Sequence, residues 1–231
     1  MYRLFIGNKN YSSWSLRPWI LMRQLGIAFE EILVPFGDGA FDAFSPTGKV
    51  PCLVDGTSVI WDSLAIAEYL AEQNPAVWPA DREARAWARC AAAEMHSGFS
   101  ALREVCTMNC GIRVQLKERP PALDRDIARI ASLWSEGLSR FGGPWLAGPD
   151  FSAVDAFFAP VAFRFQTYGI ALDKLCDSYA RRLLDLPDMK AWYSAALAEP
   201  YRDPPHEEEA LRAGAVVQDL RRRGEDVRAE L

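Results

Sequence analysis

The sequence of 231 residues has little histidine and no pair of cysteines at CxxC spacing. With His96 and His206 as its only histidines, a metal site made of histidine ligands alone is excluded. The five cysteines are odd in number, which argues against a disulfide framework and, without CxxC pairs, against structural zinc. We therefore expect no metal site and a reducing, cytoplasmic location.

Long apolar runs and an excess of positive charge are also absent. No apolar run approaches the ~18 residues of a membrane-spanning helix, and the first residues lack the basic-then-apolar pattern of a signal segment. The formal net charge is −5, and the three arginines 221–223 form a lone cluster in an acidic tail. The sequence therefore predicts a soluble globular protein without a membrane or nucleic-acid partner.

Proline placement divides the chain near residue 75. The stretch 74–81 holds two prolines, and within it we take residues 76–81 as a linker. Residues 1–75 predict a mixed α/β domain, and residues 82–203 an all-helical domain. The charged extension 204–231 lacks a clear apolar face before Leu211, so we expect it to pack only loosely.

In the first domain we expect strands at 1–6 and 27–34 with a helix between them. Pro18 constrains that helix, because only its first turn tolerates a missing N–H. An unkinked helix should therefore not be capped before about Ser15, and Gly26 closes it. A right-handed crossover then places the two strands parallel.

In the second domain we expect one long helix from 82 to about 116. Two prolines break the chain before the next helix, at 124–141. Ser152 and Asp155 form a capping box before an apolar helix. Two further helices, at about 174–184 and 188–198, close this domain.

A compact motif lies between residues 48 and 70. Val50–Pro51 opens a short apolar run, and a cis peptide bond costs little free energy before a proline. Asp55–Gly56 is a two-residue hairpin signal, followed by a second strand at 59–61. Asp62 and Ser63 then precede an apolar pattern at helical spacing. This helix start is suited to an anionic group, because its N–H groups are unpaired.

This order of parts resembles the thioredoxin-like domain of the glutathione S-transferase superfamily. The resemblance implies glutathione as co-substrate, with Val50 and Pro51 pairing with its cysteinyl unit as an added strand. It implies that Asp62 and Ser63 hold the γ-glutamyl end. Lys49 is then placed to reach the glycine carboxylate. It also implies an all-α second domain and a homodimer.

Three serines follow the first expected strand, at the place where this superfamily holds the residue that faces the glutathione sulfur. The run resembles the Ser-Ser-x-Ser-x-Arg motif of zeta-class enzymes, which assigns the hydroxyl donor to Ser12 with Ser13 beside it. Theta-like spacing from Arg17 assigns Ser13 instead. Ser15 reads as a cap residue, and Tyr11 is a further candidate because a phenol donates the same bond.

Residues 93–99 resemble the Glu-x-His-x-Gly-Phe run of beta-class enzymes, in which the histidine lines the active-site cleft. We therefore assign a second-substrate site to Met95, His96, Phe99 and Arg103, with Tyr11 from the first domain. Arg103 suits an anionic group on the electrophile, or the glutathione of the partner subunit.

The resemblance implies a glutathione transferase that conjugates or isomerises a small electrophile, with maleylacetoacetate isomerase as one such activity. The alternative is a non-catalytic glutathione-binding or interaction module of the same fold. Disulfide chemistry lacks its nucleophile, because no cysteine occurs at residues 11–15. Cys52 reads as a core residue.

Overall fold

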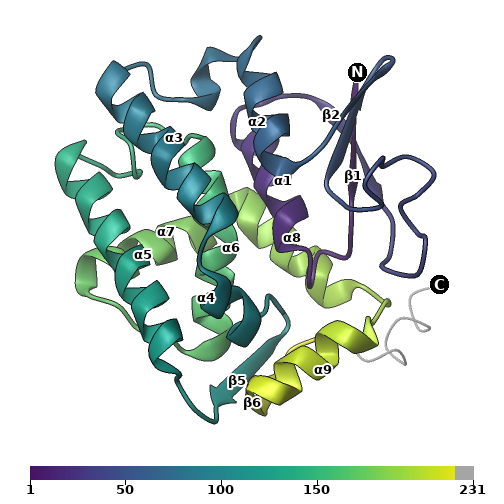
Figure 1. Ribbon diagram of the computed structural model, residues 1–231, viewed down its shortest axis with the longest axis vertical. Helices are drawn as coiled ribbons and strands as arrows, with labels where there is room; N and C mark the ends of the chain where they lie inside the picture. Colours follow the sequence, from purple (N-terminus) through teal and green to yellow (C-terminus); the bar gives the residue numbers. More distant parts are fainter. Residues whose placement is uncertain (222–231) are drawn as a thin grey trace.

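The computed structural model of the protein describes residues 1–221, and Figure 1 shows a small sheet on one side and a group of helices on the other. The sheet has four strands in the order β2-β1-β3-β4. Their bounds are β1 Tyr2–Ile6, β2 Phe29–Leu33, β3 Cys52–Asp55 and β4 Ser58–Ile60. This arrangement agrees with the predicted thioredoxin-like α/β unit.

Strands β1 and β2 are parallel, and β3 pairs antiparallel with both β1 and β4. Helix α1 (Ser13–Gln24) makes the crossover from β1 to β2, and α2 (Ser63–Ala71) follows β4. Asp55 pairs with Ser58, so the predicted hairpin turns at Gly56 and Thr57. Gly56 has φ +56°, a value that glycine adopts without steric cost.

Helix α1 begins earlier than the sequence predicted. Ser12 is its N-cap, and Pro18 lies inside the helix. The prediction that capping would not precede about Ser15 is therefore wrong, because it assumed a helix without an interior proline. Pro18 lacks the N–H that would bond the carbonyl of Trp14, and α1 continues past that missing bond.

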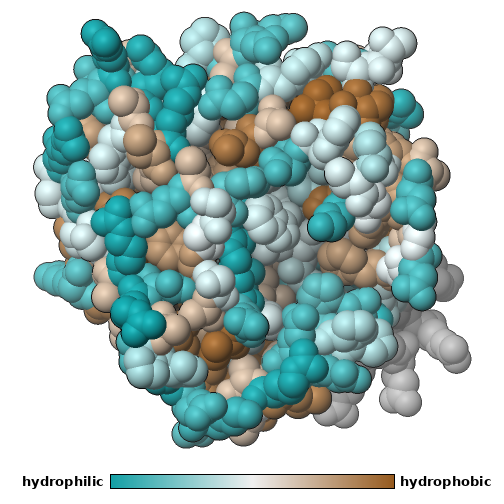
Figure 2. Space-filling view, in the orientation of Figure 1, coloured by the Kyte–Doolittle hydropathy of each residue, from teal (hydrophilic) through white to brown (hydrophobic). Residues whose placement is uncertain are grey.

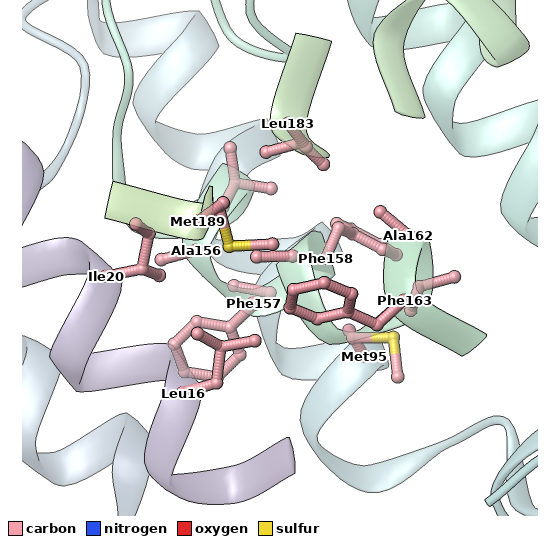
Figure 3. Close-up of a cluster of buried hydrophobic side chains, with 14 of the residues drawn as sticks. Leu16, Ile20, Met95, Ala156, Phe157, Phe158, Ala162, Phe163, Leu183 and Met189 are labelled. Carbon is pink, nitrogen blue, oxygen red and sulfur yellow. The ribbon is translucent and has the colours of Figure 1, made fainter. Parts of the chain in front are cut away.

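The second part of the chain is mainly helical and is built around α6 (Ala153–Tyr168). Its other helices are α3 Arg82–Ser97, α4 Ser100–Val105, α5 Pro121–Arg140, α7 Lys174–Asp185 and α8 Pro187–Ala198, and the 3-10 turn η1 Pro75–Val77 precedes them. Figure 3 shows Phe157 and Phe158 of α6 beside Leu16 of α1 and Met95 of α3. The predicted capping box starts α6, with the Asp155 carboxylate accepting the Ser152 N–H at 3.0 Å. The domain boundaries themselves stay a prediction.

The predicted helix at 82–116 is wrong beyond Ser97. Gly98 ends α3 with an extended backbone, and a Cβ there would lie 2.8 Å from the Glu94 carbonyl oxygen, which favours glycine. Phe99 follows with φ +57°, a left-handed backbone conformation that separates α3 from α4. Residues 112–116 then form strand β5 (Ile112–Leu116), with Ile112 and Val114 buried.

The C-terminal extension does not pack loosely over its described part. It forms α9 (Pro204–Ala213) and strand β6 (Gly214–Asp219), and β6 pairs antiparallel with β5. Figure 1 shows α9 beside this two-stranded sheet and below the larger one. The expectation for residues 222–231 lies outside the described residues.

The face shown in Figure 2 is covered mainly by hydrophilic side chains, with hydrophobic ones in small separate groups. Among residues 1–221, no helix is both long and apolar enough to cross a membrane. Within the same residues, no three histidine, cysteine, aspartate or glutamate side chains are grouped so that they could hold a metal ion.

Candidate functional site

Two neighbouring cavities lie where the loop after β1 meets the loop before β3. The first, which we call the serine pocket, has a volume of about 310 Å³. Its walls come from the first turn of α1, the loop before β3, the end of α4, α6 and α9. They are formed by Tyr11, Ser12, Ser13, Trp14, Phe36, Phe41, Gly48, Lys49, Val50, Arg103, Thr107, Met108, Arg164, His206 and Glu209.

The second cavity, which we call the proline pocket, has a volume of about 450 Å³. It lies at the start of β3 and of α2. Its walls are formed by Trp14, Thr47, Lys49, Val50, Pro51, Trp61, Asp62 and His96. Trp14, Lys49 and Val50 line both cavities, so the two cavities are immediate neighbours.

Local chemistry fixes the proline pocket. The Val50–Pro51 peptide bond is cis, as the sequence predicted, and the β1–β3 ladder begins one residue later, at Cys52. Asp62 caps α2, since one of its carboxylate oxygens accepts the Leu64 N–H at 2.9 Å. Its other oxygen lies 3.2 Å from Nε2 of His96, so a carboxylate of α2 and an imidazole of α3 share one wall.

The serine hydroxyls are used differently. Ser12 Oγ donates to Ser15 Oγ at 2.7 Å and accepts the Ser15 N–H at 3.4 Å, so it serves as the cap of α1. Ser13 Oγ accepts a bond of 3.1 Å from Nη2 of Arg164. Among residues 1–221, Ser13 donates its hydroxyl proton to no group. Of the two assignments left open by the sequence, this geometry favours Ser13 over Ser12.

Three buried or half-buried arginines surround this turn: Arg17 of α1, Arg103 of α4 and Arg164 of α6. Within residues 1–221, none of the three forms an ion pair with a carboxylate. Instead they bond to carbonyls at helix C-termini, where the helix dipole is negative. Arg103 bonds to Gly98 O at 2.9 Å and closely to Met95 O, and Arg164 bonds closely to Cys106 O.

The crowding of these guanidinium groups affects their pKa values. Burial lowers the pKa of Arg164 to about 10, repulsion by Arg103 adds to this, and Tyr168, Cys106 and Glu209 oppose it. Burial also lowers the pKa of Arg17 well below its ordinary value, with Arg103 and Arg164 contributing. The Arg17 Nε–H is buried and has no partner among the described residues. The arrangement leaves positive charge beside the serine pocket that an anion would offset.

Helix α9 forms the far wall of the serine pocket. The Tyr11 hydroxyl donates to Glu207 of α9 at 2.5 Å, and the His206 ring stacks on the Tyr11 ring at 5.1 Å. Burial, then the bond to Glu207, raises the pKa of Tyr11 to about 12. Because its hydroxyl is neutral and committed to Glu207, the geometry does not support Tyr11 as the thiol's partner.

The structure gathers some predicted site residues and separates others. Lys49, Val50, Pro51 and Asp62 line the proline pocket together. Ser63 is fully buried, accepts Nη1 of Arg17 at 3.4 Å, and does not line either cavity.

The expected second-substrate site is only partly assembled. Arg103 and Tyr11 line the serine pocket, whereas His96 lines the proline pocket. Met95 and Phe99 line neither cavity, since they are 1% and 7% exposed and belong to the core. Met95 and Phe99, like the neighbouring Leu102, therefore serve in packing.

Sequence reasoning missed Trp14, Arg164 and His206. Trp14 separates the two cavities, with the Arg17 and Arg103 guanidinium carbons 4.1 and 4.7 Å from its ring centre. Arg164 could have been noticed in the sequence, because it is the only cation in the mainly apolar helix α6. His206 could not have been found without knowing where α9 packs.

Comparisons with known proteins agree with this fold and site. Residues 11–73 match the family described as "Glutathione S-transferase, N-terminal domain", and residues 115–195 match "Glutathione S-transferase, C-terminal domain". A zeta-class glutathione S-transferase from Euphorbia esula is 31% identical, over 64% of this chain and 70% of that protein. Glutathione S-transferase Z2 from Arabidopsis thaliana is 27% identical over 66% and 74%.

Among solved structures, a glutathione transferase homologue from Burkholderia GL BGR1 with bound glutathione superimposes with a TM-score of 0.65. It is 25% identical and covers 84% of this chain and 97% of its own. The chain therefore belongs to the glutathione S-transferase family, an enzyme family whose co-substrate is glutathione. The predictions of the fold, of this enzyme class and of glutathione as co-substrate are confirmed at the level of the family.

Proposed function

We propose that this protein is a glutathione transferase that binds glutathione in the proline pocket and ionises its thiol at the first turn of α1. The observation that carries the proposal is that the two cavities adjoin and share Trp14, Lys49 and Val50 as wall residues. Val50 precedes the β1–β3 ladder, so its backbone is placed to pair with the cysteinyl unit as an added strand. Asp62 suits the γ-glutamyl amino group, and Lys49 suits the glycine carboxylate.

Thiolate formation needs only modest stabilisation. A thiol with a pKa near ~8.5 is a few per cent ionised at pH 7, and lowering that pKa by ~2 units requires ~2.7 kcal/mol. A hydroxyl that donates to the thiolate supplies ~1.5–3 kcal/mol, and the N-terminus of α1 adds ~0.3–1 kcal/mol. The proton leaves to solvent, so the site needs no histidine as general base.

The second substrate is proposed to be a small electrophile that carries an anionic group. Arg103 and Arg164 line the serine pocket, and guanidinium groups bind carboxylates through paired N–H donors. Maleylacetoacetate isomerase activity is one form of this proposal, and the zeta-class relatives support it. In that reaction the thiolate adds to a conjugated double bond, rotation follows, and the thiolate leaves again.

A homodimer in the cytoplasm completes the proposal. Trp78 and Phe99 supply no apolar surface for a subunit contact, because both are buried. Trp61 and Val59, beside the proline pocket, are 44% and 37% exposed and support a contact there. Light scattering after gel filtration should give about twice the 25.9 kDa chain mass.

A rate screen tests the function. Glutathione should react measurably faster in the presence of the protein with an aryl halide, with maleylacetone, or with both. If glutathione binds but no electrophile in a broad panel is turned over, the protein is instead a non-catalytic glutathione-binding module.

A further inference from the structure

The two serines that face the glutathione sulfur in related enzymes have unequal freedom here. The Ser12 hydroxyl donates a hydrogen bond to Ser15 Oγ at 2.7 Å. Ser15 Oγ also accepts a hydrogen bond from the Gly7 N–H at 3.2 Å. This chain of bonds holds the loop after β1 to the start of α1. Ser12 would have to break it before it could donate to a ligand.

Ser13 is in the opposite situation. A hydroxyl has one proton and two acceptor lone pairs. One lone pair of Ser13 is used by Nη2 of Arg164, so the O–H bond is oriented by that contact. Ser13 lines the serine pocket, and no acceptor among residues 1–221 takes its proton.

Arg164 is held firmly enough to orient another group. It is 5% exposed, and its second nitrogen, Nη1, bonds closely to the Cys106 carbonyl at the C-terminal end of α4. A planar guanidinium that is anchored at one nitrogen has little freedom at the other. Its charge is not offset by a paired carboxylate among the described residues. Its low pKa, caused by burial and by Arg103, is consistent with a site that favours an added negative charge.

We propose that Ser13 is the hydroxyl that stabilises the glutathione thiolate and that Arg164 is its positioning residue. The guanidinium occupies the acceptor side of Ser13, directs the O–H toward the sulfur and polarises it. Ser12 then serves only as the cap of α1. This inference rests on the proposed function and divides the work of the site between two domains.

Ultraviolet titration of the thiolate of bound glutathione tests the proposal, combined with the variants Ser12→Ala, Ser13→Ala and Arg164→Gln. We expect Ser13→Ala and Arg164→Gln each to raise the pKa of the bound thiol by about one unit, which is tenfold less thiolate at a fixed low pH. Ser12→Ala should leave that pKa nearly unchanged. The Ser13→Ala/Arg164→Gln double variant should shift little further than Ser13→Ala, because the arginine acts through the serine.

Two controls separate positioning from folding. Thr167 lies one turn after Arg164 on α6 and donates to Asn109 O at 2.7 Å without lining either cavity. Thr167→Val therefore removes a buried bond of the same helix and should leave the thiol pKa unchanged. Arg164→Lys keeps the charge but loses the paired contact of the guanidinium. We therefore expect it to raise the pKa of the bound thiol less than Arg164→Gln does. If Arg164→Gln does not fold, Arg164→Lys is used for the test in its place.

Binding of S-methylglutathione, which has no thiol, keeps this proposal distinct from the proposed function. It should bind to the parent protein and to every variant with affinities within about twofold. Failure to bind to the parent protein would reject the glutathione site itself. Normal binding with an unchanged thiol pKa in the Arg164 variants, or a full shift in Ser12→Ala, would overturn the roles of Ser13 and Arg164 alone.

Discussion

The Tyr11 hydroxyl donates to Glu207 Oε1 over 2.5 Å. This bond ties the loop after β1 to the first turn of helix α9. Glu207 also accepts Asn109 Nδ2 at 3.2 Å and pairs closely with Arg221. One carboxylate therefore joins four segments beside the serine pocket. Its neighbour His206 lies between the Tyr11 and Phe36 rings, so α9 is fastened over the pocket by both charge and stacking.

Tyr11→Phe should loosen α9 without changing the thiolate. The loss of one hydrogen bond to a charged group is expected to cost ~1.5–3 kcal/mol locally. Backbone amides of residues 204–213 should exchange hydrogen faster by about tenfold or more, whereas the pKa of bound glutathione should not move. Tyr69→Phe is the matched control, because Tyr69 donates to Asp55 at 2.9 Å in the sheet unit. A rise of the thiol pKa in Tyr11→Phe would return Tyr11 to the catalytic role.

His96 should make stability depend on pH. Burial lowers its pKa, repulsion by Arg17 and Arg103 adds to this, and Asp62 opposes it. As the pH falls through ~6.5, the unfolded chain therefore takes up this proton more readily than the folded one, and stability is lost. Urea unfolding from pH 7.5 to 5.5 should show a smaller loss in His96→Asn than in the parent protein. Equal losses would mean that His96 titrates alike in both states.

Asp155 should be one of the most sensitive positions for stability. Its carboxylate accepts the Leu146 and Ser152 N–H groups and the Tyr179 hydroxyl, each within 3.0 Å, inside the core. Asp155→Ala leaves these donors unpaired and should lower the free energy of unfolding by about 3 kcal/mol. Asp150→Ala, a change at an exposed position in the segment before α6, should stay within about 0.5 kcal/mol. Similar small effects for both would show that the cap contributes little.

Arg103 should distinguish charged from neutral electrophiles. Arg103→Gln removes a guanidinium from the wall of the serine pocket, so KM for a carboxylate-bearing electrophile should rise about tenfold. KM for a neutral aryl halide should change by less than about threefold. Arg89→Gln is the control, since Arg89 lies on α3, pairs with Glu68 and lines neither cavity. Equal changes for both substrates would assign Arg103 to structure rather than to substrate choice.

The grouping of residues in the proline pocket could be predicted because it is local. Val50, Pro51 and Asp62 lie within one stretch whose turn, strand and cap signals are short-range, and the structure brings them to one cavity. The fold could be predicted from the same signals and from the helical sequence patterns after residue 82.

The rest depended on contacts that no local pattern encodes. The helix pattern over 82–116 failed because Phe99 adopts a left-handed conformation and Val114 pairs with Val216 of a distant strand. The contact on the Ser13 hydroxyl comes from Arg164, 151 residues further along the chain. Charge and spacing near the serines contain no information about such a partner.

In the proposed mechanism, the serine hydroxyls at the first turn of α1 keep the sulfur of bound glutathione ionised. Ultraviolet titration of the thiolate in the complex of the unaltered protein measures this directly. We expect a pKa about two units below the ~8.5 of an unperturbed thiol. A bound thiol that titrates at its free value would contradict it.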